Sequence, residues 1–435
     1  MIRVLCLAAA FVLAMAAPAA AHNVTAGADL RIAQTIAGAE VTVVVKGTTR
    51  VPGPLRIGVV AYQPVSGLRV GLEVRSVDDG HTVTGTAQAT ANPQFTQLQV
   101  ERAGPHELRL SAGDEVAVIP FRVLVERQSA GDFLIYGGLF VAAILLVGGL
   151  LTGALARPGP AMALAAGAAA GVTVAAMVVV FASQVPPPAP AGAAPTSTTA
   201  QGRPYAQVRM ETVPARPLAG EEFTLRADLI DGSTGRPVDD LTAHHEALAH
   251  VIVTSEDGRY FRHVHPLRTA PGHLEVRLSA DRPGRYLAHA ELEREGSGGQ
   301  LVAADFTVGG TAQAPVKSGT ATEPGGAGAP AAQAGTTATP RLQPVAPVAG
   351  RPTTIELDTP AGVRTWLGMT GHLLIRSQDG DFFGHVHEMG TPGSRVRFTF
   401  SFPEPGRYLA WIQYATADRI VTVPLTVNVT ASETQ

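Results

Sequence analysis

The sequence predicts a mainly β protein, in which three Ig-like β-sandwich domains accompany a transmembrane hairpin of two helices. Three observations lead to this prediction. Short runs that alternate apolar and polar residues are separated by Gly, Pro and Asp along most of the chain, as is typical of β-sandwiches. Two long apolar runs carry no charged residue, which favours membrane-spanning helices. One segment of sixteen residues occurs twice, with histidine at the same three places.

The first 21 residues have the layout of a secretory signal peptide. Arg3 precedes an apolar stretch that ends in three alanines, so we expect cleavage after Ala21. The one cysteine of the chain, Cys6, lies within this segment. The mature protein is therefore expected to lack cysteine, which excludes disulfides, thiolate nucleophiles and cysteine metal ligands.

An N-terminal β-sandwich is expected over residues 22–130, followed by transmembrane helices over 133–156 and 161–183. The short turn between the helices carries Arg157, which the positive-inside rule places on the cytoplasmic side. Two crossings then leave all the β domains on the outer side of the cell membrane, in the periplasm or at the cell surface. Two glycine pairs predict where the helices approach each other closely: Gly149 with Gly153, and Gly167 with Gly171.

Two further β-sandwiches, over residues 206–308 and 341–430, are predicted to be repeats. The heptapeptide PGRYLAH of the first recurs as PGRYLAW in the second, 122 positions later, and the same offset relates the two histidine segments. A Pro/Ala-rich linker at 184–205 precedes the first repeat, and a Gly/Ala/Pro/Thr-rich linker at 309–340 joins the two. Such a linker is flexible, so we expect each repeat to bind a ligand independently of the other.

The repeated segment reads HVIVTSEDGRYFRHVH from position 250 and HLLIRSQDGDFFGHVH from position 372. Its Asp-Gly indicates a β-hairpin with a type I′ turn, and counting outward places Ile252 opposite His263 and His250 opposite His265. Residues opposite each other share a face of the sheet, as do residues two apart on one strand. Three imidazoles on one face can converge on one metal ion. The predicted metal ligands are His250, His263, His265, His372, His385 and His387.

Nearby residues favour copper as the metal. Imidazole and thioether ligands without thiolate are typical of copper sites. If cleavage follows Ala21, the new first residue also offers an amine and an imidazole to one copper ion. The possible additional ligands are His22, His244, His245, His289, Met369 and Met389. The alternative is that these side chains are ordinary strand-face histidines and gap-filling methionines.

The pattern H-x-x-x-x-S-x-D-G-x-x-F-x-H-x-H, followed by PGRY, resembles the YtkA-like (FixH-related) β-sandwich domains of bacterial extracytoplasmic proteins. The matching positions are His250, Ser255, Asp257, Phe261, His263 and His265, and again His372, Ser377, Asp379, Phe383, His385 and His387. The resemblance covers about half of the mature chain. It implies copper binding, because such domains are often found with proteins that handle copper and heavy metals. Family copies often continue with proline, which is kept as Pro266 and replaced by Glu388.

These observations predict a membrane-anchored, extracytoplasmic metal-binding protein that buffers, stores or delivers copper. Its expected partners are the lipid bilayer and a membrane metal transporter or an apo-cuproprotein. No serine elbow, phosphate loop or HExxH motif is present, so no enzymatic activity is expected. With 33 basic and 36 acidic residues, the chain lacks the basic excess of a nucleic-acid-binding protein. The alternatives are a non-catalytic Ig-like scaffold or adhesion protein, and an accessory subunit of a nickel/cobalt-type metal transporter.

Overall fold

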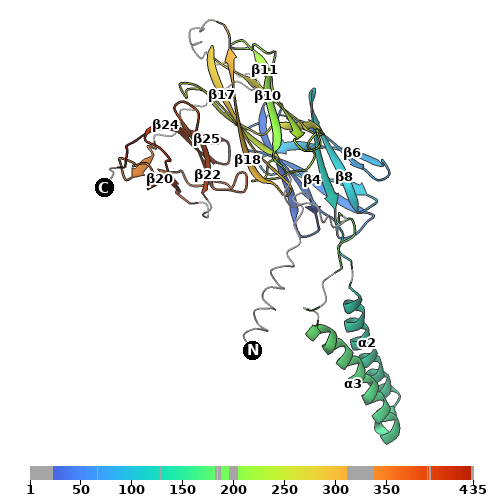
Figure 1. Cartoon of the computed structure of the whole chain (residues 1–435). Helices are drawn as coiled ribbons and strands as arrows, with labels where there is room; N and C mark the ends of the chain where they lie inside the picture. The colour runs from blue at the N-terminus through green and yellow to red at the C-terminus, as the bar shows by residue number, and fades with distance from the viewer. Residues whose placement is uncertain are drawn as a thin grey trace.

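The computed structural model describes residues 23–65, 67–127, 129–181, 184, 188–194, 204–310, 338–388, 390 and 393–432. It confirms a mainly β fold of several β-sandwich sheets with two apolar helices. In Figure 1 the N-terminal domain (blue to cyan), the first repeat (green to yellow) and the second repeat (orange to red) form the β part, and the two helices project away from it together. The predicted signal peptide and most of the linker at 309–340 lie outside the described residues.

The N-terminal domain is a sandwich of nine strands. One layer has the order β1-β9-β8-β5-β6 and the other contains β2, β3, β4 and β7, with a short parallel contact between β4 and β6. Burial alternates along β9, where Ala117, Ile119 and Phe121 point into the core. The strands are β1 (Asn23–Val24), β2 (Asp29–Ile36), β3 (Ala39–Lys46), β4 (Gly53–Ala61), β5 (Arg69–Ser76), β6 (Thr82–Thr90), β7 (Thr96–Val100), β8 (Gly104–Ala112) and β9 (Glu115–Val123).

The two helices are α2 (Ala130–Leu151) and α3 (Pro158–Phe181), with a 3₁₀ turn, η1 (Ala154–Ala156), between them. A capping box sets the start of α2: the Asp132 amide donates to Ser129 Oγ and the Ser129 amide donates to an Asp132 carboxylate oxygen, each at 3.0 Å. At its other end Gly153 takes a left-handed conformation, φ 68°, which terminates helices readily. The boundaries therefore differ from the expected 133–156 and 161–183.

The two helices approach most closely at Gly138 and Gly171. A Cβ atom at Gly138 would lie 2.5 Å from the Gly171 carbonyl oxygen, so neither position accepts a larger residue without movement. Of the four predicted glycines, Gly171 lies at this approach, whereas Gly149 faces Leu164 and Gly167 faces Leu145. By length and composition both helices could cross a membrane, with mean hydropathies of 2.4 and 2.3.

Both ends of the helical hairpin are attached to the N-terminal domain. The chain enters α2 shortly after β9, and after α3 it returns to the same strand end. There Val125 and Ala191 exchange backbone hydrogen bonds of 3.1 and 2.8 Å, and Arg122 Nε donates to the Gly192 carbonyl at 2.8 Å. The start of α2 and the end of α3 therefore lie at the same end of the helical hairpin, the end next to the N-terminal domain, as Figure 1 shows.

Each repeat is a sandwich of two sheets. The first repeat has the sheets β10-β11-β16-β15 and β12-β17-β13-β14, with β18 added to β17; the second has β19-β20-β23 and β22-β21-β24-β25. The strands of the first are β10 (Ala206–Val213), β11 (Glu222–Asp231), β12 (Leu241–Thr242), β13 (Ala249–Ser255), β14 (Phe261–Val264), β15 (Leu267–Ala270), β16 (His273–Ser279), β17 (Gly284–Arg294) and β18 (Gly298–Val308). Those of the second are β19 (Arg341–Gln343), β20 (Pro352–Asp358), β21 (Gly371–Ser377), β22 (Phe383–Glu388), β23 (Arg395–Ser401), β24 (Gly406–Ala415) and β25 (Ile420–Val429).

The two repeats pack against each other through the sheets that carry the histidine hairpins. Six side chains form one buried apolar cluster between the sheets: Ile252, Phe261, Leu374, Phe383, Leu409 and Trp411. Equivalent contacts recur in both directions, since Phe261 stacks on Trp411 at 4.8 Å between ring centroids and Phe383 stacks on His289 at 4.6 Å. Trp411 and His289 are equivalent residues of the two repeats, 122 positions apart. The repeats therefore form a pseudo-symmetric pair within one chain.

Arg376 stabilises the interface between the two repeats through hydrogen bonds. Its side chain is fully buried, and its guanidinium donates to Thr254 Oγ1 at 3.0 Å and to the Ser255 and Glu256 carbonyls at 2.8 Å each. Burial lowers the pKa of Arg376 to about 10. Because a buried donor left without a partner costs about 1–3 kcal/mol, the buried guanidinium holds the two repeats in the arrangement that provides these acceptors. The expected independence of the repeats is replaced by a shared, buried interface.

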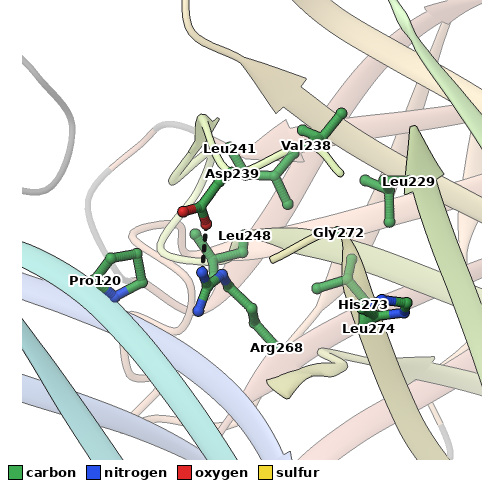
Figure 2. A pocket seen from close by; sticks show the side chains of 10 residues that line it. All are labelled: Pro120, Leu229, Val238, Asp239, Leu241, Leu248, Arg268, Gly272, His273 and Leu274. Atoms are coloured by element: carbon green, nitrogen blue, oxygen red, sulfur yellow. Dashed lines mark hydrogen bonds and ion pairs between the residues drawn. The ribbon is translucent and has the colours of Figure 1, made fainter. Parts of the chain in front are cut away.

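The N-terminal domain packs against the first repeat. Arg268 is buried, pairs with Asp239 and donates to the Val118 carbonyl at 3.2 Å. Figure 2 shows this pair in a small hollow beside Pro120 of the N-terminal domain. At the other edge of the contact, the Thr35 amide donates to the His265 carbonyl and the His265 amide donates to Thr35 Oγ1, both at 2.8 Å. Strand β2 thus reaches the end of the first histidine hairpin.

Candidate metal centre

Both hairpins have the register that the sequence predicts. Ile252 pairs with His263 in the first, and Leu374 pairs with His385 and His372 with His387 in the second. The expected turn type is wrong, because Gly258 and Gly380 have positive φ, 73° and 89°, whereas the preceding aspartates do not. Positive φ at both central positions defines type I′, so these turns belong to another class.

The Ser-x-Asp-Gly sequence builds this turn through its side chains. Ser255 Oγ donates to Asp257 Oδ1 at 2.6 Å and accepts from the Tyr260 amide at 2.9 Å, while Asp257 Oδ1 accepts from the Arg259 amide at 3.0 Å. Ser377 and Asp379 make the same contacts in the second copy. These bonds fix the register by which the three histidines reach one face.

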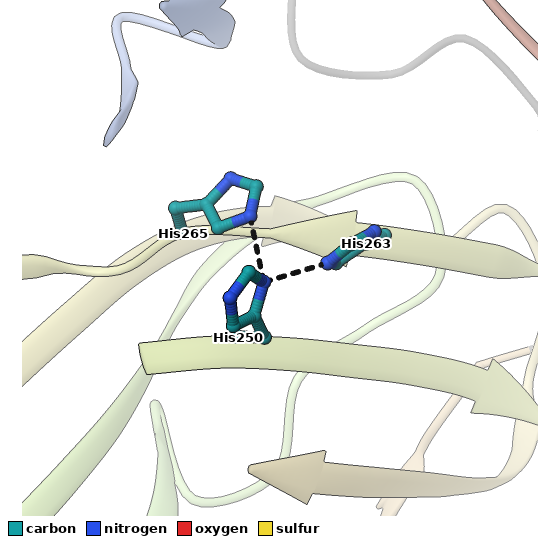
Figure 3. A group of neighbouring side chains, drawn as sticks. All are labelled: His250, His263 and His265. Carbon is teal, nitrogen blue, oxygen red and sulfur yellow. Dashed lines mark hydrogen bonds between the residues drawn. The ribbon is translucent and has the colours of Figure 1, made fainter. Parts of the chain in front are cut away.

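His250, His263 and His265, here called the first trio, converge through one nitrogen each. His250 Nδ1 lies 3.1 Å from His263 Nε2 and 3.1 Å from His265 Nε2, as Figure 3 shows. All three residues are buried, with exposed fractions of 1%, 8% and 0%. The three nitrogens therefore face a shared point that water does not reach readily.

The opposite nitrogen of each ring in the first trio faces an oxygen acceptor. His250 Nε2 lies 2.9 Å from the His244 carbonyl, and His263 Nδ1 lies 2.9 Å from Gln413 Oε1 of the second repeat. His265 Nδ1 bonds to a carboxylate oxygen of Glu40, on β3 of the N-terminal domain. A neutral imidazole that donates on one side has a bare lone pair on the other. When each outer nitrogen donates to its oxygen partner, the three converging nitrogens all present lone pairs.

His372, His385 and His387, the second trio, repeat this arrangement. His372 Nδ1 lies 3.3 Å from His385 Nε2, and one nitrogen from each of the three rings lies within 4.8 Å of the others. The outer nitrogens again face oxygens: His372 Nε2 lies 3.2 Å from the Trp366 carbonyl, and His385 Nδ1 lies 2.8 Å from Glu291 Oε2. Among the described residues, His387 Nε2 is buried without a hydrogen-bond partner.

A metal ion fits the chemistry of both trios. Three nitrogens at about 2 Å from one tetrahedral ion lie about 3.3 Å apart, close to the separations of 3.1 and 3.3 Å found here. Lone pairs that face each other gain no hydrogen bond unless a proton or a cation joins them. Ring nitrogens that donate to carbonyls and carboxylates are also the usual outer support of histidine ligands. The residues present therefore suit a metal ion, and their chemistry leaves its identity open.

Burial keeps these imidazoles neutral. Desolvation lowers the pKa of His263, His265 and His387 to about 3, and the pKa values of His250, His372 and His385 are also lowered, in each case chiefly by burial. Desolvation raises the pKa of Glu291 to about 7 and that of Glu40 well above its usual range. Neutral imidazole is the form that binds metal ions.

The two trios lie next to each other across the repeat interface. The His385 ring centroid is 5.3 Å from that of His263 and 5.4 Å from that of His250, and His263 is 6.0 Å from His372. Trp366 packs beside both trios, 5.4 Å from His263 and 4.9 Å from His372. The predicted ligands of two separate domains thus form one cluster of six imidazoles.

The additional candidates divide into several groups. His289 lies in the apolar interface, stacked on Phe383, with Nε2 3.3 Å from the Gly380 carbonyl, so the structure places it outside the first trio. Met369 is half-buried in the turn after Trp366, where the two exchange backbone hydrogen bonds of 2.9 Å. His22 and Met389 fall outside the described residues.

His244 and His245 lie beside the second trio, although they belong to the first repeat. The ring centroids of His245 and His387 are 3.9 Å apart, as are those of His244 and His245. His245 is 6.4 Å from His250. The sequence did not predict that these residues of the first repeat would contact the histidines of the second repeat.

Sequence reasoning missed the oxygen partners of the trios. Glu40, Glu291 and Gln413 occupy strands whose alternation shows nothing unusual, and Glu40 reaches His265 across 225 positions of sequence. One weak indication of these partners was present in the sequence: Glu291 and Gln413 are 122 residues apart and so occupy equivalent positions of the two repeats. Each of them contacts a histidine in the trio of the other repeat. No local pattern identifies such partners.

Comparisons with known proteins identify one domain family. Residues 205–312 and 335–431 both match the family described as "Domain of unknown function (DUF8832)", which agrees with two repeats. No curated protein matches the chain.

Among solved structures, the chain is similar to a tetra-tandem repeat in the extending region of a large adhesion protein, with 9% identity, 92% of this chain and 75% of that chain covered, and a TM-score of 0.18. It is also similar to two fibronectin type-III domains of chicken tenascin, with 11% identity, coverages of 52% and 99%, and a TM-score of 0.16. A third is the alpha-2-macroglobulin of Escherichia coli, with 9% identity, coverages of 88% and 23%, and a TM-score of 0.20. Scores this low carry no conclusion about the function of this chain.

Proposed function

We propose that this protein binds two metal ions at the interface between its repeats, one in each histidine trio. The observation that supports this most is the convergence of lone-pair nitrogens, fixed by oxygen partners on the outer side of the rings. A cluster of six neutral imidazoles, four of them in buried residues, would be costly without a cation, because burial of polar groups is compensated only when they find partners. The role of the protein is then to hold metal rather than to catalyse a reaction.

Copper is the metal that we propose. The affinity of nitrogen sites for divalent ions rises from cobalt through nickel to copper and falls again at zinc. A site made of imidazoles, without thiolate, follows this order and holds copper most tightly when all the ions are present. The resemblance to domains of copper-handling proteins points in the same direction, and the protein would buffer, store or deliver the ion.

We further propose that the protein is anchored in the cell membrane with every β domain on the outer side. Two apolar helices of sufficient length, a single arginine in the turn between them and the return of the chain to β9 support this arrangement. A membrane metal transporter or an apo-cuproprotein would be the natural donor or acceptor of the ion beside the membrane.

The full-length protein in detergent is expected to retain two copper ions per chain. Metal-free protein is dialysed against equal concentrations of Cu²⁺, Zn²⁺, Ni²⁺ and Co²⁺, and the bound metals are measured by elemental analysis. The control is His273→Ala, which removes a surface imidazole that pairs with Asp228 at 2.7 Å and should leave the result unchanged. Protein that retains no metal would favour a scaffold or adhesion role, and preference for nickel or cobalt would favour the transporter-accessory alternative.

Topology is tested with reporter fusions. A phosphatase that works only outside the cytoplasm is expected to be active when fused after Ala200 and inactive when fused after Arg157, because an even number of crossings returns the chain to its starting side. A cytoplasmic reporter should give the reverse pattern. Activity of the cytoplasmic reporter after Ala200 would contradict the proposed orientation.

A further inference from the structure

The two trios differ in their access to solvent. The first trio is enclosed by Glu40 and Thr35 of the N-terminal domain and by Trp366 of the second repeat, and its rings are almost wholly buried. In the second trio, His387 is half-buried. An ion that enters from solvent therefore meets the second trio before the first.

His244 and His245 extend the cluster toward the surface. Both are partly exposed, and successive ring centroids are separated by 3.9 Å from His244 to His245 and 3.9 Å from His245 to His387. The row continues inward through His385, 4.4 Å from His387, to His263, 5.3 Å further on. Imidazoles in contact can pass an ion from one to the next without releasing it to water.

The backbone holds His245 in this place. His244 and Ala247 exchange hydrogen bonds of 2.9 and 3.0 Å around a turn in which His245 and Glu246 have φ of 47° and 61°. Such φ values are uncommon for residues other than glycine. Glu246 is attached to the N-terminal domain, since its carboxylate lies 2.6 Å from Arg31 Nε and its carbonyl accepts from the Ala33 amide. The turn that carries His244 and His245 is therefore held in place by contacts with the N-terminal domain.

The equivalent turn of the second repeat lacks histidine. Trp366 and Leu367 stand where the first repeat has His244 and His245, and Leu367 has nearly the same φ, 53°. Trp366 packs beside both trios and adds no further imidazole to either. The turn of the second repeat therefore shields the trios with Trp366, whereas the turn of the first repeat adds His244 and His245 between the second trio and solvent.

We infer that His244 and His245 form a relay through which metal ions load the second trio and, beyond it, the enclosed first trio. This inference rests on the proposed metal binding. His245 is a transient ligand rather than a permanent one, because its ring lies beside that of His387, tilted by 42°, and it is absent from the group whose nitrogens converge. The relay sets the rate of loading and leaves the final affinity to the trios.

The experiment compares loading rate and affinity in the full-length protein with Cu²⁺ as the probe. Quenching of tryptophan emission reports loading, since one of the two tryptophans, Trp366, lies 4.9 Å from His372 and 5.4 Å from His263. His245→Leu is the central variant, because leucine already occupies the equivalent turn at Leu367. We expect loading to slow by about tenfold, the lower end of the one to three decades by which association rates vary among mutants of a protein–protein interface, while competition with a chelator gives parent-like affinity.

The controls separate this inference from the proposed function. His387→Ala should weaken the affinity itself, and His273→Ala should change neither quantity. Loading of His245→Leu at the parent rate would overturn the relay, as would a loss of affinity equal to that of His387→Ala, which would make His245 an ordinary ligand. If His387→Ala binds copper as the parent does, the proposed metal centre fails and the relay fails with it.

Discussion

Acidifying the metal-free protein from about pH 7 to about pH 5 is expected to separate the two repeats and to lower the melting temperature sharply. Burial holds the pKa of His263, His265 and His387 at about 3 in the closed structure, whereas an exposed histidine titrates near 6.5. Below that pH the open or unfolded state binds protons that the closed state does not. The stability of the closed state is therefore lost as the pH falls.

The size of the effect follows from the number of groups. Each histidine with a strongly lowered pKa costs the closed state about 1.4 kcal/mol per pH unit below about 6.5, or roughly 2 kcal/mol at pH 5. Glu40 and Glu291 act in the opposite direction, since their raised pKa values mean that the closed state takes up their protons first. Because six histidines oppose two carboxyls, the net result of acidification is a loss of several kcal/mol, a large part of the whole stability of a domain of about 5–15 kcal/mol.

The measurements are calorimetric melting and small-angle scattering of the metal-free chain at the two pH values. Bound copper should suppress the effect, because the ion replaces the protons at the same nitrogens. The variant His273→Ala, which lacks a surface histidine, should respond to acid as the parent does. An unchanged melting temperature and radius of the metal-free protein at the lower pH would show that the trios do not carry this cost.

Replacing His263 with alanine is expected to remove copper from the first trio. The ring contributes one of three converging nitrogens and also lies 5.3 Å from His385 of the second trio, so both ions should bind less tightly. A three-nitrogen site reduced to two loses several kcal/mol, whereas the loss of an outer partner costs about 10–100-fold in affinity, or ~1–3 kcal/mol. The measurement is a copper titration of the full-length protein against a competing chelator.

Gln413→Ala is the matched control for the outer partner. It removes the acceptor of the His263 Nδ1 proton, 2.9 Å away, but retains all six imidazoles, so its loss of affinity should be the smaller one. Melting of each metal-free variant verifies that the repeats still pack together. Equal affinity of His263→Ala and the parent would show that the histidines are part of the interface packing alone.

The sequence by itself determined the features that depend on near neighbours. The two apolar helices follow from runs of uncharged residues, and the strand register that pairs Ile252 with His263 follows from counting outward from Asp257-Gly258. Strand periodicity and turn position are local, so three histidines on one face could be predicted without the rest of the fold. The turn type was wrong because the Ser255 and Asp257 side chains, rather than the Asp-Gly pair alone, shape the turn.

Only the tertiary structure decided that the two trios meet. In HVIV and HLLI apolar residues occupy both faces of the strand, with Val251 and Val253 in the core of the repeat and Ile252 in the interface. That pattern shows that both faces are buried but not what covers them. The covering surface depends on the fit between side chains far apart in the chain, such as Phe261 on Trp411 and Arg376 on the Ser255 carbonyl. For the same reason no local pattern could identify Glu40 beside His265 or His245 beside His387, since each contact joins two different domains.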